Sequence, residues 1–243
     1  MKFDTVTIAI GATDETESLI KTVNSIMENC NTDDIECLLI VIPENATQKC
    51  IDTIDFLMNE YPSKVQKDVQ RRPYIGGAMQ DAIEDVNTSH IMFFAADLTS
   101  NLECVPLMIE KAKKNPDVII KTSRWLEKNS FYGYSKTKKI FNYLAQFFLQ
   151  RIFVSDITDF TSPVLISPTE IYKKANFKEM KFPCLLEAVL IPLRMGCRFE
   201  EVPVKCFQRT EGKSKNSVFQ TMLYIKPALR IRFTKKENLI KKQ

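Results

Sequence analysis

The sequence of 243 residues has few of the residues on which several common enzyme classes depend. Histidine occurs once, as His90 before an apolar run, which excludes a histidine-rich metal site and disfavours a Ser-His-Asp triad. A structural role for His90 is the favoured interpretation. The phosphate-binding pattern G-x-x-x-x-G-K-S/T and the dinucleotide pattern G-x-G-x-x-G are both absent. The first predicted strand leads into GATDETES, which also lacks the basic glycine-rich loop of a nucleotidyltransferase.

Paired cysteines and a targeting segment are missing as well. The seven cysteines are an odd number, form no C-x-x-C pair and lie partly in apolar runs, so we expect reduced packing residues. The first residues, MKFDTVTIAIG, lack the charged region and the long apolar region of a signal peptide. Together these features predict a cytoplasmic protein.

No apolar run reaches the roughly 20 residues that a membrane-spanning helix needs. The longest, residues 140–153, is interrupted by Asn142, Gln146, Gln150 and Arg151. Its large apolar residues follow helical spacing, and packing in the protein core is favoured over contact with a membrane surface.

Charge of one sign is also scarce over the whole chain. With 34 Lys+Arg against 30 Asp+Glu, the net charge of +4 is too balanced for a nucleic-acid-binding surface, and no nucleic-acid partner is expected. The excess is local, because residues 205–243 hold eleven basic residues and two acids, Glu211 and Glu237. Such an end suits phosphate groups or an anionic membrane surface.

The apolar patterns that are present predict an α/β fold. Apolar and β-branched runs predict strands at residues 5–12, 36–42, 65–69, 91–96 and 117–122. Helical spacing predicts a helix capped by Asp14, a second helix at residues 46–59 and a third that Gly76 and Gly77 open. This alternation implies a mainly parallel, doubly wound sheet of Rossmann type with flanking helices.

The second half of the chain is less regular. Its patterns predict a helix at 136–153, an extended piece at 156–166, a helix including 185–195 and a strand at 198–206. A partly helical tail at 217–233 is expected to be interrupted at Pro227, because proline has no N–H to donate within a helix.

A lone carboxylate, Asp97, follows the buried run at 91–96. In open α/β sheets ligands bind outside the carboxyl ends of the strands, so Asp97 could hold a metal ion or a ligand hydroxyl. From its position alone Asp97 could equally start a turn or cap the next helix.

Small and polar residues recur in order at the ends of the predicted strands. The set is Asp14 with Glu15, Glu44 with Asn45, Gly76-Gly77-Ala78, Asp97, Ser123 with Arg124, Asp156-x-Thr158, Glu187, EVPV at 201–204, and R-x-x-G-x-S-K at 209–215. In this order and spacing it resembles the family-2 glycosyltransferases of GT-A fold, especially the polyprenol-phosphate sugar transferases (dolichol-phosphate mannosyltransferase-like). The resemblance covers roughly residues 5–216, and implies one GT-A domain at 1–216 and a basic, partly helical tail at 217–243.

The resemblance also implies roles for single residues. Asp97 would bind a metal ion, and Asp156 and Glu187 would act beside it in catalysis. The two glycines would allow close approach of the donor. The implied donor-binding set is Ala12, Asp14, Glu15, Glu44, Gly76, Gly77, Ala96, Asp97, Arg124, Arg209, Ser214 and Lys215.

The sequence departs from the family pattern at the donor side. Ala95 stands where the first aspartate of the Asp-x-Asp metal motif is expected, and Pro43-Glu44 replaces the usual Asp-Asp after the second strand. The expected cofactor is Mg²⁺ or Mn²⁺, held by one carboxylate, the substrate's phosphates and water. Asp159-Phe160-Thr161 replaces the usual Gly-Phe, so the family pattern does not predict the acceptor pocket.

The resemblance implies an inverting glycosyltransferase that moves a sugar from a nucleoside diphosphate sugar to a lipid-linked, polyprenyl phosphate, or glycan acceptor. Its expected setting is the cytoplasm, with peripheral contact at the inner membrane face and a role in cell-envelope glycan synthesis. The alternative is a catalytically degenerate GT-A domain that binds a nucleotide, a glycan or a partner protein, motivated by Ala95 and Pro43.

Overall fold

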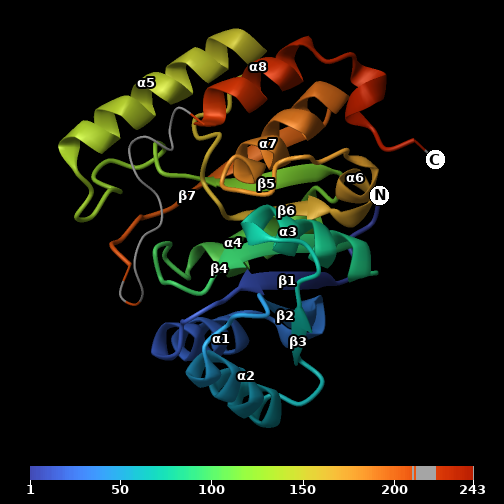
Figure 1. Ribbon diagram of the computed structural model, residues 1–243, viewed down its shortest axis with the longest axis vertical. Helices are drawn as coiled ribbons and strands as arrows, with labels where there is room; N and C mark the ends of the chain where they lie inside the picture. The colour runs from blue at the N-terminus through green and yellow to red at the C-terminus, as the bar shows by residue number, and fades with distance from the viewer. Residues whose placement is uncertain (210, 212–222, 243) are drawn as a thin grey trace.

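A computed structural model describes residues 1–209, 211 and 223–242, and they form a seven-stranded sheet with helices on both faces (Figure 1). The strands are β1 (Val6–Gly11), β2 (Ile35–Ile42), β3 (Val65–Val69), β4 (His90–Ala95), β5 (Val118–Ser123), β6 (Leu165–Pro168) and β7 (Arg198–Pro203). The α-helices are α1 (Glu17–Asn29), α2 (Gln48–Glu60), α3 (Tyr74–Asp85), α4 (Cys104–Lys114), α5 (Lys136–Phe153), α6 (Thr169–Lys174), α7 (Cys184–Met195) and α8 (Ile225–Phe233), and two short 3-10 helices are η1 (Thr32–Asp34) and η3 (Lys236–Leu239). The predicted α/β fold is confirmed.

The strand order is β3-β2-β1-β4-β6-β5-β7, and only β6 runs antiparallel to its neighbours, β4 and β5. The predicted mainly parallel sheet is therefore present. The extended piece expected at 156–166 is a strand only at its end, because side chains of α5 hold residues 157–161 in a loop.

Apolar residues cover both faces of the sheet, as expected for buried parallel strands. One face, with Ile8 and Ile10, packs against α1, α2 and α4. The other, with Ala9 and Phe93, packs against α3, α6, α7 and α8. Since both faces are covered, the ends of the strands are where a ligand can reach the sheet.

The proline of α8 does not interrupt the helix, contrary to expectation. Pro227 lies in the first turn of α8, where backbone N–H groups have no acceptor within the helix, so its missing N–H costs nothing there. Ala228 and Ile231 of α8 are buried against α7. The boundary expected between residues 216 and 217 lies outside the described residues.

The helix α5 has its polar side turned inward, and its predicted packing in the core is wrong. Gln146 and Leu149 are its buried residues, and Gln146 bonds to the backbone N–H of Phe160 and to Thr161. The large apolar side chains lie outside, with Phe148 60% exposed. In Figure 1, α5 and α8 lie together at the opposite end of the molecule from α1 and α2.

His90 is a structural residue, as expected. It is fully buried, and its two ring nitrogens lie 3.0 Å from the carbonyl oxygen of Pro116 and 3.1 Å from the Ser89 hydroxyl. Burial lowers the pKa of His90 to about 4, so the ring is neutral in the folded protein near pH 7. All seven cysteines lie in the described part of the chain and are free thiols. Among the described helices, none is both long and apolar enough to cross a bilayer.

Candidate functional site

The site lies where the chain leaves the parallel strands β1 and β4 at the centre of the sheet. Gly11 and Ala95, the last residues of these strands, are partners in the register, so the segments after them emerge side by side. The strand order reverses direction at this point, with β2 beyond β1 and β6 beyond β4. A crevice at such a switch point is where open α/β sheets bind ligands. Here it forms an open cleft of about 2640 Å³.

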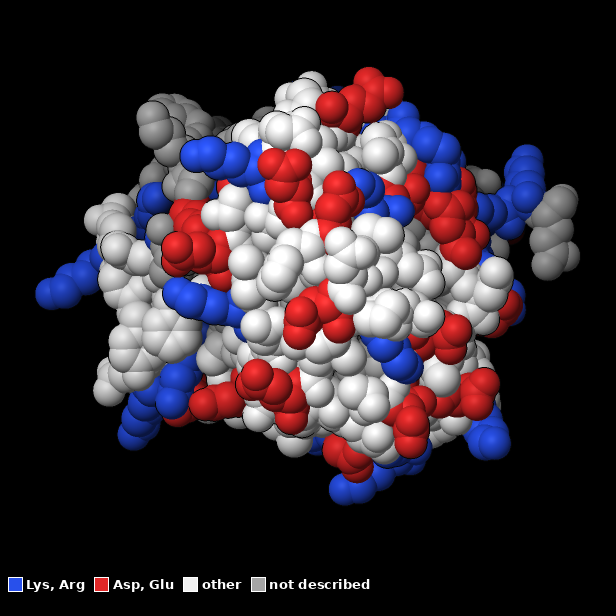
Figure 2. Space-filling model, turned by 90° about the horizontal axis from the view of Figure 1, so that it is seen from below, with Lys and Arg blue, Asp and Glu red and all other residues white. Residues whose placement is uncertain are grey.

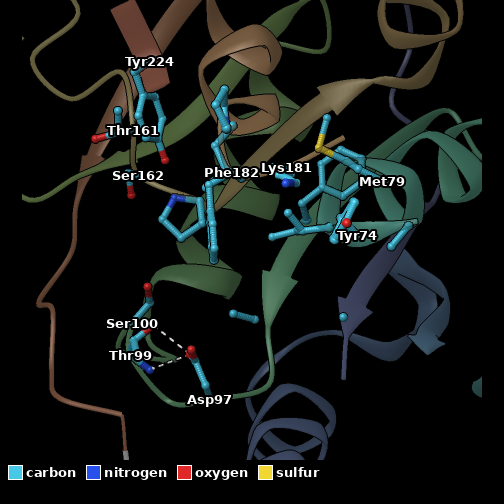
Figure 3. Close-up of a pocket in the computed structure, with 18 of the residues that line it drawn as sticks. Tyr74, Met79, Asp97, Thr99, Ser100, Thr161, Ser162, Lys181, Phe182 and Tyr224 are labelled. Atoms are coloured by element: carbon cyan, nitrogen blue, oxygen red, sulfur yellow. Dashed lines mark hydrogen bonds between the residues drawn. The ribbon is translucent and has the colours of Figure 1, made fainter. Parts of the chain in front are cut away.

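Asp97 lies at one end of this cleft and is 6% exposed (Figure 3). Its Oδ1 accepts hydrogen bonds from the Thr99 backbone N–H at 3.1 Å and the Thr99 hydroxyl at 2.7 Å. Leu98 between them has a φ of 54°, a left-handed conformation that costs a residue with a side chain about 1 kcal/mol. Asp97 thus both forms a turn and faces the cleft. It does not cap α4, which begins at Cys104 after Glu103.

Arg209 reaches Asp97 from a part of the chain 112 residues away. The segment after β7 runs beside the Asp97 turn, where Phe207 donates its N–H to the Thr99 carbonyl at 2.9 Å and Ser100 pairs with Cys206. Arg209 then donates from Nε and Nη2 to Asp97 Oδ2, at 3.0 and 2.7 Å. The two residues form an ion pair inside the cleft.

Glu15, in the turn after β1, supports this ion pair. Glu15 accepts the N–H groups of Thr13 and Asp14 at 2.8 and 3.2 Å, and its Oε1 lies 3.8 Å from Arg209 Nη1. Glu15 therefore closes the turn after β1 and contacts the guanidinium group.

Glu211 caps the first helix, a role the sequence assigned to Asp14. Its carboxylate accepts hydrogen bonds from the backbone N–H and the hydroxyl of Ser18, at 3.3 and 2.8 Å, and from Thr16 N–H at 2.8 Å. Burial raises the pKa of Glu211, but the hydrogen bonds from Thr16 and Ser18 outweigh it, and the net pKa shift is downward. Negative charge at a helix N-terminus is favourable. Glu211 thereby ties the chain just after Arg209 to α1.

A second arginine–aspartate pair lies deeper in the molecule. Arg124 donates from Nε to Asp159 Oδ2 at 2.6 Å and from Nη2 to Oδ1 at 2.8 Å. Asp159 is fully buried, and Thr161 N–H also donates to it at 3.1 Å. Burial raises the pKa of Asp159, but the charge and hydrogen bonds of Arg124 outweigh burial and lower the pKa to about 2. Nothing local in the sequence singled out Asp159 as the partner of Arg124.

The divalent metal ion expected at Asp97 does not fit the described residues. Both carboxylate oxygens already accept hydrogen bonds, one from Thr99 and one from Arg209. Ala95 offers no second carboxylate. Over residues 1–209, 211 and 223–242, no group of three or more histidine, cysteine, aspartate or glutamate side chains is placed to hold a metal ion. One carboxylate can hold Mg²⁺ or Mn²⁺ together with substrate phosphates and water, but the carboxylate of Asp97 is already engaged by Thr99 and Arg209.

Asp156 and Glu187, the two other predicted catalytic acids, do not line the cleft. Asp156 is exposed in the loop after α5. Glu187 is fully buried, accepts the N–H groups of Lys178 and Glu179 at 2.8 and 2.7 Å, and pairs with Arg230 of α8. The geometry therefore supports a structural role for Glu187 and gives neither acid access to a substrate in the cleft.

The two glycines that open α3 serve the packing of the chain itself. A Cβ on Gly76 would overlap the backbone of Glu179 and Met180, and one on Gly77 would overlap Arg72. Neither glycine lines the cleft. Their small size therefore allows close packing within the protein rather than the expected close approach of a donor.

Of the other residues predicted to bind the donor, Ser214 and Lys215 lie outside the described residues. The cleft lining includes Ala12, Asp14, Glu15, Glu44, Ala96, Asp97, Arg124 and Arg209. Residues that the sequence did not indicate also line it, among them Lys138, Lys181 and Tyr224. In Figure 3, Asp97 and Thr99 lie at one end of the pocket and Thr161, Ser162 and Tyr224 at the other, with Phe182 between.

The chain was compared with known protein families and with solved structures. The family model described as Glycosyl transferase family 2 matches residues 7–180. Among solved structures, glucosyl-3-phosphoglycerate synthase from Mycobacterium tuberculosis with Mn²⁺, UDP and phosphoglyceric acid matches with a TM-score of 0.69 and 13% identity, over 94% of this chain and 78% of that one. The same enzyme with Mn²⁺, UDP-glucose and phosphoglyceric acid gives a TM-score of 0.70 and 12% identity, over 94% and 79%. With Mg²⁺ and UDP the values are 0.69, 12%, 94% and 79%.

Proposed function

This chain belongs to glycosyl transferase family 2, and we propose that it transfers a sugar from a nucleoside diphosphate sugar to a polyprenyl phosphate or another lipid-linked glycan acceptor at the inner face of a membrane. The relatives with solved structures hold UDP or UDP-glucose, which supports a UDP-sugar as the first donor to try. The acceptor proposed here differs from the phosphoglyceric acid of those structures, because of the residues that line the cleft. A role in cell-envelope glycan synthesis would follow from such an acceptor.

One observation carries the proposal: the cleft joins a polar end to an apolar end. The polar end holds Asp97, Glu15 and Arg209 at the switch point of the sheet. The apolar end is lined by α5, through Phe141 and Leu144, and by α8. A nucleoside diphosphate suits the first end, and the hydrocarbon chain of a lipid-linked acceptor suits the second.

The proposed reaction is a single displacement. An acceptor oxygen attacks the anomeric carbon on the face opposite the diphosphate, the new C–O bond forms as the old one breaks, and the electron pair leaves with the nucleoside diphosphate. The sugar configuration is therefore inverted. Negative charge builds on the leaving diphosphate, and cationic donors such as Arg209 stabilise it.

A phosphate acceptor fits this cleft better than a hydroxyl acceptor. A hydroxyl needs a carboxylate to take its proton, whereas a phosphate oxygen is already nucleophilic. Glu15 and Asp97 are engaged with backbone N–H groups and Arg209, and Asp156 and Glu187 do not line the cleft. Asp14 and Glu44 also line the cleft, on the segments that follow β1 and β2, whereas Lys138 and Lys181 offer positive charge to an acceptor phosphate.

The outer side of α5 supports docking on an anionic lipid bilayer. Ile140, Tyr143 and Phe147 are 60%, 55% and 41% exposed. The helix carries four basic residues and no acid, and each basic residue near an anionic surface contributes about 1 kcal/mol of binding free energy. On the face shown in Figure 2, by contrast, acidic and basic side chains are interspersed. A bilayer bound to α5 would also bring a lipid-linked acceptor to the apolar end of the cleft.

The direct test is a transfer assay with a panel of UDP- and GDP-sugars, offered with polyprenyl phosphate in vesicles or with soluble 3-phosphoglycerate. We expect labelled sugar from one donor to enter the lipid phase, with inverted configuration in the product. Transfer to the soluble acceptor alone would reject the lipid acceptor. A complete lack of transfer from every donor would reject the enzymatic proposal for these acceptors.

Docking is tested separately by flotation with vesicles that contain about a third phosphatidylserine. The double variant Ile140→Asp with Phe147→Asp should lose binding, because it places charge in the apolar face of α5. Phe56→Asp is the matched control, since Phe56 is 53% exposed on α2. Equal flotation of the two variants would reject α5 as the docking surface.

A second candidate is a catalytically degenerate domain that binds a nucleotide, a glycan or a partner protein. The occupied Asp97 and the alanine at position 95 favour it. The same assay separates the two, because a binding module would show nucleotide binding by calorimetry and no transfer with any acceptor.

A further inference from the structure

We propose that this chain binds and activates the donor diphosphate without a divalent cation, and that the Arg209 guanidinium group does the work of the metal ion. The inference rests on the proposed function, because it concerns the same donor. It differs from what the solved relatives suggest, since their structures hold Mn²⁺ or Mg²⁺ together with UDP.

Both carboxylate oxygens of Asp97 already accept hydrogen bonds. A metal ion bound there would have to displace Arg209 from Oδ2, where two N–H groups donate at 3.0 and 2.7 Å. Oδ1 is held by two hydrogen bonds from Thr99. No second carboxylate lies two residues earlier, because that residue is Ala95. Binding of the ion would break the charge-assisted hydrogen bonds between Arg209 and Asp97, and the ion would gain one protein ligand in return.

The guanidinium group of Arg209 is placed to bind a ligand in the cleft. Its side chain is 30% exposed and lines the cleft. Asp97 uses Nε and Nη2, and Nη1 lies 3.8 Å from Glu15, too far for a hydrogen bond. Within residues 1–209, 211 and 223–242, no acceptor lies within hydrogen-bond distance of Nη1, so Nη1 and the second N–H of Nη2 can donate to a ligand. A planar guanidinium fork matches phosphate oxygens, and its charge does not depend on pH in the physiological range.

Arg209 is held in place by the chain on both sides of it. Phe207 is bonded to Thr99 on one side, and Glu211 is bonded to Thr16 and Ser18 at the start of α1 on the other. A donor group that is positioned before the substrate arrives needs little reorganisation as charge develops on the leaving group. Glu211 is thus a positioning residue for Arg209.

The step requires no reactant besides the donor and the acceptor. The acceptor oxygen forms a bond to the anomeric carbon as the bond between that carbon and the β-phosphate oxygen breaks, the electron pair stays on the phosphate oxygen, and Arg209 N–H groups donate hydrogen bonds to the diphosphate. The same contacts bind the nucleoside diphosphate before and after transfer, so binding alone reports on them.

Calorimetry on the full chain tests the proposal with UDP and GDP, each titrated in EDTA and again in Mn²⁺. We expect one of the two nucleotides to bind in EDTA, with an affinity that Mn²⁺ changes by less than about threefold. Binding that appears only with Mn²⁺, or tightens at least about tenfold with it, would overturn this inference and leave the proposed function intact. If neither nucleotide bound in either buffer, both would be overturned.

Two variants sharpen the result. Arg209→Gln should weaken nucleotide binding in EDTA by at least about tenfold, while Arg198→Gln, which removes a 70% exposed arginine at the start of β7, should leave it unchanged. Asp97→Asn should weaken binding much less than Arg209→Gln, because it keeps a hydrogen-bond acceptor for Arg209. If Asp97→Asn weakened binding more than Arg209→Gln in Mn²⁺, Asp97 would be identified as a metal ligand and the inference would be overturned. Circular dichroism confirms that each variant is folded.

Discussion

Among the arginine–aspartate pairs beside the cleft, Arg124 with Asp159 and Arg209 with Asp97 differ in burial. Asp159 is fully buried, the Arg124 side chain is 11% exposed, and two N–H groups of Arg124 bond to separate oxygens of the carboxylate. In the second pair, Arg209 is 30% exposed and bonds to a single oxygen of Asp97. Both pairs join segments that are distant in sequence.

The difference in burial separates a structural pair from a ligand-binding pair. Arg124 and Asp159 fix the loop after α5 against β5, and removing one partner would leave the other charged and buried. Arg209 is 30% exposed in an open cleft, and among the described residues its side chain donates only to Asp97, so we expect this pair to contribute less to stability and to be able to contact a substrate. The same two residue types thus serve the fold in one place and the proposed chemistry in the other.

The largest expected effect is on the buried pair. Asp159→Asn should lower the free energy of unfolding by about 3–5 kcal/mol, because it leaves the Arg124 charge without its counter-ion. Urea denaturation measures the change. Asp117→Asn is the matched control, since Asp117 pairs with Arg198 in an exposed position and should lower the free energy of unfolding far less than Asp159→Asn. Equal losses in the two variants would remove the distinction between buried and exposed pairs.

A smaller effect should appear in the pH dependence of the buried pair. The pKa of Asp159 is about 2 in the folded protein, below its ordinary value of 3.8, so the pair's contribution is present above pH 3.8 and is lost as the pH falls through about 2. The difference in unfolding free energy between the wild type and Asp159→Asn should narrow by about 2 kcal/mol over this interval. Denaturation curves across that pH range check it. A constant difference would mean that Asp159 is not stabilised as a carboxylate.

The smallest effect on stability should follow loss of Arg209 from its pair with the buried Asp97. Arg209→Gln should lower the free energy of unfolding by about 1 kcal/mol, less than Asp159→Asn, because Arg209 is 30% exposed and the hydrogen bonds from Thr99 still stabilise the Asp97 carboxylate. The measurement is again urea denaturation, beside Asp159→Asn. A loss as large as that of Asp159→Asn would show that Arg209 is needed for the fold rather than for a ligand.

Local pattern was enough to predict most of the fold. The apolar run that ends at Ala95 is the central strand β4, and the helix at 136–153 has the predicted bounds in α5. Periodicity could not tell which side of α5 faces inward. Gln146, which interrupts the apolar run, makes the inward contacts, because the buried backbone N–H of Phe160 in the neighbouring loop needs an acceptor that an apolar side chain cannot supply.

The site was predictable where residues directly follow a strand. Asp97 and Glu15 lie at the cleft because the strands before them are neighbours in the sheet. The bond between Asp97 and Arg209 joins residues 112 positions apart and leaves no local signal. Glu187 was expected at the site, yet burial among backbone N–H donors makes it structural. Only tertiary structure decides which acid is buried and which reaches the cleft.

The most direct measurement of the central claim is the initial rate of sugar transfer in EDTA, for the wild type and Arg209→Gln, with Arg198→Gln as the control. The account predicts that the wild type and the control transfer sugar without a divalent cation, and that Arg209→Gln is slower by at least about tenfold. Transfer that requires Mn²⁺ in the wild type, or that is unchanged in Arg209→Gln, would contradict it.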